Sequence, residues 1–274
     1  MLKFVEVVKN YLGVINWGEI MQRLFAVLAI LFSILFIGSA MAGPIGTAVA
    51  VYGSATVSGP GGSHALNAGS PVFEHDKITV VAGNAQIELL DGTKLVVGAN
   101  SALVLEKFLM KGGAAAQNVS VDALRGTFRF ITGKSPKSAY NINTANATIG
   151  IRGTGFDFWV ADRTGVALLK GNVRLCSKTN RRSCINLEPN CSIGVAGDPN
   201  PARTLRGFDK TAVIGNRLPY LINQDPLRSS FRLNTTSCER DLPQVHENHD
   251  FKPPTPRTRP GDGEGGECDG PCGE

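Results

Sequence analysis

The stretch "ITVVAGNAQIELLDGTKLVVG" at residues 78–98 is the part of the sequence that decides the fold class. Apolar Ile87 and Leu89 alternate with polar neighbours, and the alternation resumes at Leu95 and Val97 after the intervening "DGT". A period of two places the apolar side chains on one face of a strand, and Asp-Gly between two such runs is a strong hairpin signal. The stretch therefore predicts an antiparallel hairpin.

Similar strand-like runs lie on both sides of this hairpin, at residues 48–57, 101–108, 119–133 (split at Arg125-Gly126), 140–160 and 164–176. A spacing of about 8–12 residues between strands is typical of a sandwich or a roll. With 42% hydrophobic residues, 19% charged residues and 32 glycines, the chain is long enough for one sizeable domain. We therefore predict an all-β fold, a two-sheet sandwich or short β-roll of short strands, with a small disulfide-bearing mixed C-terminal extension.

The first 42 residues have the organisation of a secretory signal peptide. An apolar run of 14 residues, Leu24 to Ile37, follows Arg23, and the small residues after it end in an Ala-x-Ala pattern at Ala42. A bilayer span needs about 20 apolar residues, so this run is short for an anchor. We expect cleavage after Ala42 and a periplasmic or secreted protein, with Met21 as the alternative translation start. An uncleaved membrane anchor is the competing interpretation.

The cysteines agree with export. Four of them, Cys176, Cys184, Cys191 and Cys238, lie in the part expected to fold, and an even number suits disulfides in an oxidising compartment. Four cysteines allow three pairings, among which we favour Cys176–Cys184 and Cys191–Cys238. Structural zinc is disfavoured because these four lack paired C-x-x-C spacing. The "CDGPC" segment holds a further candidate disulfide, between Cys268 and Cys272.

Composition divides the chain into four segments: the signal peptide at 1–42, a β-domain at 43–175, a cysteine-containing extension at 176–238, and a tail at 239–274. The extension mixes helix-compatible and turn residues, so we expect one or two short helices there. The tail is rich in proline and glycine with almost no apolar content, which predicts disorder.

Charge is unevenly distributed along the chain. Residues 43–238 carry 21 basic and 12 acidic side chains, whereas residues 239–274 carry 4 basic and 9 acidic ones. A basic exported domain is suited to anionic polymers or lipid headgroups of an envelope. Without a dense patch beyond "KTNRR" at 178–182, ordinary solvated surface is the simpler interpretation.

Catalytic and metal-binding motifs are scarce. The four histidines are His64, His75, His246 and His249, and the chain contains no G-x-S-x-G, H-E-x-x-H or Walker loop. The "HENHD" pair could bind a metal only weakly, because a site needs more ligands on a rigid scaffold. We therefore predict no enzyme activity, no cofactor and no metal site.

The segment "GIRGTG" at residues 150–155 has the glycine order G-x-x-G-x-G, and "FDFWVADRTG" after it does not predict a helix, so it is no dinucleotide loop. Apolar residues occupy odd positions up to Ile151 and even positions from Phe156. Because side chains alternate with period two, the register must slip by one residue between them. We predict a β-bulge with Gly153 and Gly155 on either side of Thr154. Arg152 then has a structural role: its head either extends to the rim of the sheet or bridges exposed carbonyls and a carboxylate, with Asp157 or Asp122 as candidates. A ligand contact is the alternative.

Four stretches resemble the FecR-domain family of bacterial envelope proteins: "LLDGTKLVVGANSALVLEKF" (89–108), "LRGTFRF" (124–130), "INTANATIGIRGTGFDFWV" (142–160) and "TGVALLKGNVRL" (164–175). The R-G-T-x-F element at residues 152–156 is the most specific of these, and Ala145 replaces a common proline. The resemblance implies an all-β periplasmic domain that, in the founding members, senses a transporter and signals to a sigma factor. At most 23 residues precede the apolar run here, so we expect the cytoplasmic signalling half of those regulators to be missing.

These observations predict a non-enzymatic exported FecR-like domain that binds an envelope partner, either a protein or a polysaccharide. The alternative is a membrane-anchored periplasmic sensor subunit of a transmembrane signalling system. Nucleic acid is not an expected partner, and membrane contact is expected only if the N-terminal apolar segment is uncleaved.

Overall fold

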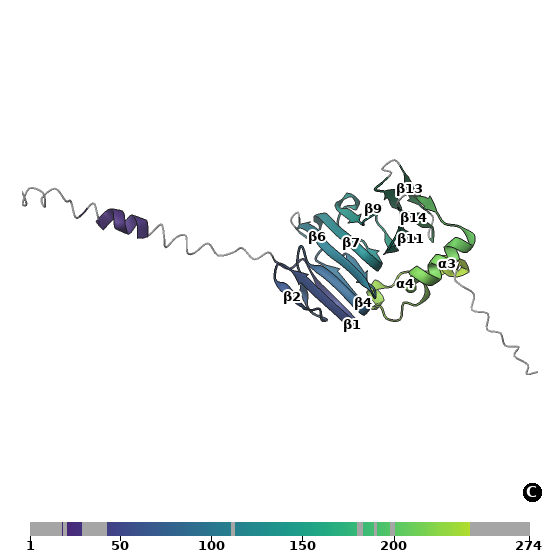
Figure 1. Ribbon diagram of the computed structural model, residues 1–274, viewed down its shortest axis with the longest axis horizontal. Helices are drawn as coiled ribbons and strands as arrows, with labels where there is room; N and C mark the ends of the chain where they lie inside the picture. Colours follow the sequence, from purple (N-terminus) through teal and green to yellow (C-terminus); the bar gives the residue numbers. More distant parts are fainter. Residues whose placement is uncertain are drawn as a thin grey trace, which may run out of the picture.

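A computed structural model describes residues 18, 21–28, 43–110, 113–179, 183–188, 191–197 and 201–241 (Figure 1). Residues 21–28 are helical, and no helix within these ranges is both long and apolar enough to cross a membrane. The predicted cleavage site at Ala42, nearly all of the predicted tail, and Cys268 and Cys272 lie outside the described residues.

The described chain is built mainly from strands, which confirms the all-β prediction. Fifteen of them join in one hydrogen-bonded sheet. They are β1 (Gly46–Gly59), β2 (Gly62–Ala65), β3 (Pro71–Val72), β4 (Lys77–Leu89), β5 (Lys94–Val97), β6 (Ser101–Met110), β7 (Ala116–Ile131), β8 (Tyr140–Asn143), β9 (Ala147–Ile151), β10 (Gly155–Val160), β11 (Thr164–Lys170), β12 (Val173–Ser177), β13 (Cys184–Leu187), β14 (Ile193–Ala196) and β15 (Arg203–Thr204). The hairpin predicted within residues 78–98 is present as the antiparallel pair β4–β5.

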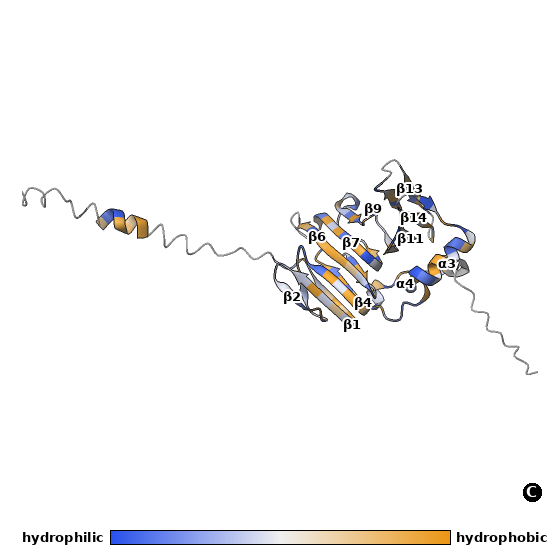
Figure 2. Ribbon diagram, in the orientation of Figure 1, coloured by the Kyte–Doolittle hydropathy of each residue, from blue (hydrophilic) through white to orange (hydrophobic). Residues whose placement is uncertain are grey.

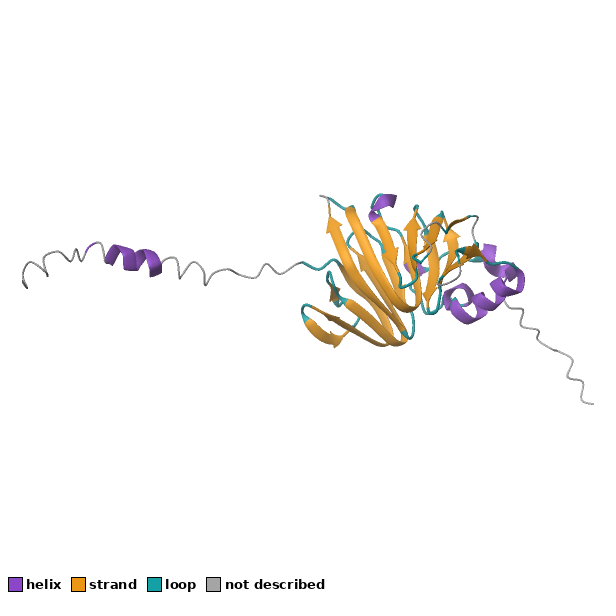
Figure 3. Ribbon diagram, turned by 45° about the horizontal axis from the view of Figure 1, so that its top comes forward, coloured by secondary structure: helices purple, strands orange, loops and turns teal. Residues whose placement is uncertain are grey.

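Strand β7 is where the sheet divides into two layers. Its first half pairs with β6 and with β8, and its second half pairs with β5 and with β10. The sequence predicted two strands separated at Arg125-Gly126, but the strand is continuous. Gly126 instead has φ 104°, a conformation that glycine adopts without strain, and the pairing partners change at this point. From there β8, β9, β12 and β13 continue one layer, and β10, β11, β14 and β15 continue the other (Figures 1 and 3).

A second bend lies at a pair of opposed glycines. Gly53 on β1 is the register partner of Gly83 on β4, and both have positive φ, 84° and 78°. A Cβ on Gly83 would lie 1.9 Å from the carbonyl oxygen of Tyr52, so no other residue fits there without moving the backbone. The two long strands therefore bend together, which lets the sheet curve into a roll.

The main core fills the space between the two layers. Its aromatic centre comes from alternate residues of β7 and β10, with Phe128 stacked on Phe158 at 4.8 Å and Phe130 on Phe156 at 5.6 Å between ring centroids. Figure 2 shows the corresponding alternation of hydrophobic and hydrophilic residues along β7. Parity was thus predicted correctly for the inward face of β10.

The C-terminal extension adds the helices α3 (Gly207–Arg217) and α4 (Pro219–Ile222), followed by the short 3-10 helices η2 (Ser229–Phe231) and η3 (Thr236–Asp241). They lie against the outer face of the layer that contains β10, β11 and β14 (Figures 1 and 3). This second core includes Trp159 and Ile214, and the indole of Trp159 occupies the space above Gly165, its register partner. The layer is therefore buried on both faces.

Two disulfides lie in the chain from residue 176 to residue 238. Cys176 is bonded to Cys184 across β12 and β13, and Cys191 is bonded to Cys238 at η3. This is the pairing favoured from the sequence. The predicted domain boundary at residue 175 falls inside β12 and stays a prediction.

Candidate functional site

A buried ion pair lies on the outward face of β7 and β10, beneath the extension. Arg129 and Asp157 are register partners on the two strands, and both side chains are 0% exposed. Arg129 Nε donates to Asp157 Oδ1 at 2.6 Å, and Nη2 donates to Oδ2 at 2.9 Å. This two-pronged geometry fits a planar guanidinium to a carboxylate and is the strongest form of such a contact.

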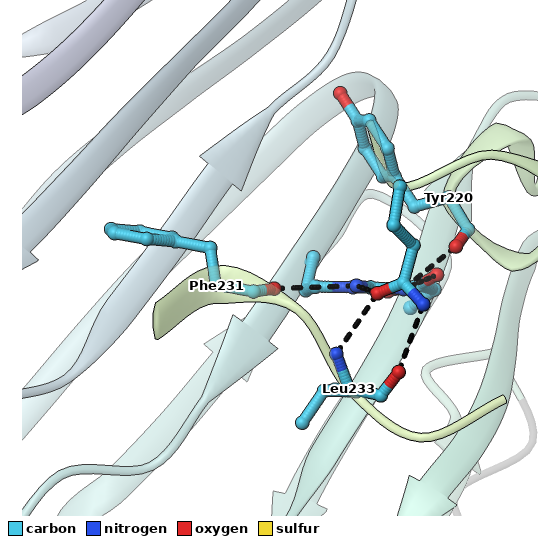
Figure 4. A network of polar contacts seen from close by, with 6 residues as sticks. Tyr220, Phe231 and Leu233 are labelled. Atoms are coloured by element: carbon cyan, nitrogen blue, oxygen red, sulfur yellow. Dashed lines mark hydrogen bonds and ion pairs between the residues drawn. The ribbon is translucent and has the colours of Figure 1, made fainter. Parts of the chain in front are cut away.

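The remaining donors of Arg129 reach the extension (Figure 4). Nη2 also donates to the carbonyl of Tyr220 at 3.1 Å, and Nη1 donates to the carbonyl of Phe231 at 3.3 Å and to Gln224 Oε1. Gln224 in turn donates to the carbonyl of Leu233 at 2.8 Å and accepts from its backbone N–H at 2.9 Å. The guanidinium therefore binds one strand neighbour and three groups from the segment that covers it.

This network joins the sheet to the extension through a buried ion pair and hydrogen bonds. A buried charge is costly unless it is paired and hydrogen-bonded. Asp157 supplies the pairing from within the sheet, and the extension buries the pair and supplies the remaining hydrogen-bond acceptors of Arg129. Its guanidinium also lies 5.7 Å from the ring centre of Tyr220. Burial, and next the negative charge of Asp157, raise the pKa of the Tyr220 hydroxyl well above its usual value, against a smaller lowering by Arg129. With its donors used and no access from solvent, this pair is unsuited to catalysis.

The sequence patterns did not indicate this pair and pointed to a different arginine, Arg152. Arg129 and Asp157 occupy the polar positions of two alternating strands, which in a one-sided sheet face water. The one available signal was that both lie among consecutive large apolar residues, in "FRF" and "FDFWV". Such density indicates a strand buried on both faces.

The segment around Arg152 connects the two layers. The predicted bulge within one strand is wrong, because β9 ends at Ile151 and β10 begins at Gly155, and the two strands pair with different neighbours. The change of parity arises because the chain leaves one layer and enters the other. Gly153 has φ 74°, and the backbone N–H of Arg152 donates to the carbonyl of Asn172 at 3.1 Å.

Arg152 itself is exposed and does not pair with either predicted carboxylate. Asp157 is bonded to Arg129, and Asp122 accepts from Asn143 Nδ2 at 3.1 Å. Thr154, by contrast, is 2% exposed, and its backbone exchanges hydrogen bonds with Thr132. The structural role proposed for residues 152–155 thus stays a prediction, with backbone contacts rather than the arginine side chain in its support.

The "DGT" turn forms a second buried polar cluster. Asp91 is 1% exposed and accepts from the backbone and hydroxyl of Thr93, from Ser135 Oγ at 2.6 Å, and from Tyr140 Oη at 3.0 Å. Burial is the largest cause that raises the pKa of the Tyr140 hydroxyl. With four donors satisfied, the carboxylate ties the β4–β5 turn to the loop before β8.

The layer that the helices leave uncovered has a polar outer face, called here the open face. It consists of the outward residues of β7, β8, β9, β12 and β13, which alternate with buried ones. Register pairing places Asn141, Gly150 and Arg174 in one row and Asn143, Thr148 and Cys176 in the next. A hollow of about 540 Å³ lies there, lined by Thr148, Arg174, Ser177, Lys178 and the Cys176–Cys184 disulfide.

Convergent catalytic groups are not found in the described part of the chain. No cluster of three or more His, Cys, Asp or Glu side chains suited to a metal occurs within it. His75 is exposed, with Nδ1 at 4.0 Å from Glu106, and His64 is also exposed. His246 and His249 lie outside the described residues.

Comparison with known proteins shows what part of the chain is similar to a family. Two crystal structures of a protein from Parabacteroides distasonis, provisionally described as an anti-sigma factor, are similar at 17% identity and TM-score 0.38. They match 51% and 50% of this chain, which spans 63% and 62% of theirs. No curated protein matches. Residues 76–174 match the FecR protein family, which agrees with the resemblance seen in the sequence.

Proposed function

We propose that this chain is a non-enzymatic, exported FecR-domain protein that binds a partner in the bacterial envelope through its open face. The family match supports an envelope protein, and the two disulfides support an oxidising compartment. The absence of convergent titratable groups in the described residues supports binding over catalysis.

The observation that carries the proposal is the asymmetry between the two outer faces. The extension buries one of them under a second apolar core and the Arg129 network. The other keeps its outward side chains accessible. Its hollow combines two cations, Arg174 and Lys178, with the hydroxyl of Thr148. Such a surface offers charge and hydrogen bonds to a partner without any rearrangement of the fold.

A capture experiment tests this proposal. Full-length protein with a photo-crosslinking residue in place of Thr148 is expressed in its own host, and adducts from intact envelopes are identified by mass spectrometry. We expect one dominant partner, lost on Arg174→Glu and kept on Arg217→Glu, which reverses an exposed charge on α3. Equal loss with both variants, or adducts no different from those of a crosslinker placed on α3, would contradict it.

The same preparation tests export. A mature N-terminus at Gly43 is the expected mass-spectrometric result. A protein that keeps residues 24–37 would instead support the membrane-anchored sensor.

A further inference from the structure

Four cations lie at one end of the sandwich, where β7, β9 and β11 end and β10 begins. They are Lys134, Lys137, Arg152 and Lys170, called here the basic end, and all four are exposed. They come from three segments of the chain. Lys134 and Lys137 lie in the loop after β7 and at the start of the 3-10 helix η1 (Lys137–Ala139), Arg152 lies in the β9–β10 crossing, and Lys170 ends β11. The match to the FecR family assigns no role to these four residues.

Side-chain and backbone contacts show that these segments lie close together. The methylene chain of Lys137 lies over Gly153, where an added Cβ would be 2.8 Å from Lys137 Cε. Lys170 is the register partner of Gly155, only three residues from Arg152. The backbone N–H of Lys134 donates to the carbonyl of Asp91 at 2.9 Å, which ties its loop to the same end.

The charge of this end is unbalanced. None of the four cations forms an ion pair with a described residue. Of the described carboxylates nearby, Asp91 is buried with its oxygens occupied, and Glu88 is paired with Lys94 at 3.3 Å. Glu188, after β13, is an exposed exception. In addition, Thr154 Oγ1 is buried in this segment without a hydrogen-bond partner.

We propose that the basic end is a binding site for an anionic polysaccharide, whose carboxylate or phosphate groups contact these four side chains. Protein interfaces usually centre on an apolar or aromatic anchor. The aromatic residues that this end contributes, Tyr140 and Phe156, are both buried. The accessible groups are cations, small polar side chains and glycine backbone, beside the isolated apolar residues Leu90 and Pro136. Such groups recognise a polymer of charges and hydroxyls. The site is separate from the open face, so its test does not depend on that proposal.

Direct titration of purified full-length protein tests the site. The probes are alginate, dextran of equal length as the neutral control, phosphatidylglycerol vesicles, and a synthetic peptide of residues 260–274, which holds five acidic and no basic side chains. The variant replaces all four cations of the basic end with glutamine. The matched control replaces Lys77, Arg125, Arg206 and Arg217, four exposed cations elsewhere, and so changes the net charge equally.

We expect alginate to bind and dextran not to bind, with affinity that falls as salt rises because exposed charges are screened. Each lost contact between exposed charges weakens binding by about two- to fivefold, so the basic-end variant should bind at least about tenfold more weakly. The matched control should change by less than about threefold. Circular dichroism and thermal melting verify that both variants fold.

Three outcomes would overturn the inference. Equal losses in the two variants would mean that only net charge matters. Peptide binding as tight as alginate would assign the site to an acidic protein, and vesicle binding with no alginate binding would assign it to a lipid surface.

Discussion

Replacing Asp157 with asparagine is the most direct perturbation of the Arg129 network that joins the sheet to the extension. The substitution keeps the shape of the side chain and removes the charge that compensates Arg129, at a position where both side chains are 0% exposed. Removing one member of a buried ion pair costs about 3–5 kcal/mol, because the other charge is left without compensation. Domains of this kind are stable by only about 5–15 kcal/mol, so Asp157→Asn should remove a large part of the free energy of unfolding.

Urea unfolding followed by tryptophan fluorescence and circular dichroism measures this loss. An exposed pair serves as the control: Asp162 and Arg163 lie 3.6 Å apart with side chains 74% and 41% exposed, so Asp162→Asn should cost less than about 1 kcal/mol. The double variant Arg129→Met with Asp157→Leu removes both charges. It leaves the carbonyls of Tyr220 and Phe231 without their donor, at about 1–3 kcal/mol each if they stay buried.

The double variant should therefore lose less stability than the sum of the losses in Arg129→Met and Asp157→Leu measured singly. Hydrogen exchange supplies a local measurement, since amides of residues 218–233 should lose protection before those of β7 and β10 in Asp157→Asn. A cost below about 1 kcal/mol for Asp157→Asn, or strict additivity in the double variant, would refute the reasoning.

Three further predictions concern pH, crosslinks and backbone shape. Because the pKa of Tyr220 is raised, the unfolded chain releases this proton near pH 10.0 while the folded protein keeps it, so stability falls as pH rises past that value. Tyr220→Phe should flatten the alkaline fall of the urea midpoint, and identical curves for wild type and variant would contradict the assignment. Loop-closure entropy predicts a loss of about 4 kcal/mol for Cys238→Ser and about 2.5 kcal/mol for Cys184→Ser, from sequence separations of 47 and 8; equal losses would contradict it. Gly83→Ala should prevent folding or cost more than about 3 kcal/mol in thermal melts, because the added Cβ meets the carbonyl of Tyr52. Gly92→Ala, with similar φ but open space around it, should cost about 1 kcal/mol. Similar costs for the two variants would show that the close carbonyl is not decisive.

Strand periodicity predicted most of the central sheet. The β4–β5 hairpin follows from the "DGT" turn, and the inward faces of β9 and β10 follow from parity. Periodicity could not tell a bulge from a crossing between layers at residues 152–154, because both change parity by one residue. Only the pairing partners distinguish them, and those are fixed by contacts distant in sequence.

The sequence pointed to Arg152 and not to Arg129 for a related reason. Arg152 has glycines around it and large apolar residues after it, yet its side chain is exposed where the chain crosses between layers. Arg129 occupies an ordinary outward position, and it is buried only because residues 218–233, about 90 positions later, cover it. A tertiary cover of this kind leaves no periodic signal in the strand that it covers.

The cover also limits where a partner can bind. Residues 207–241 lie outside the segment that matches the FecR family, and they cover the outer face of β10, β11 and β14. A partner that used this face would have to displace the helices that precede the Cys191–Cys238 disulfide, expose Trp159, and leave Arg129 with Asp157 as its main remaining partner. Binding at the open face or at the basic end requires none of these steps. The extension therefore leaves the open face and the basic end as the surfaces that the proposed partners could reach in the folded protein.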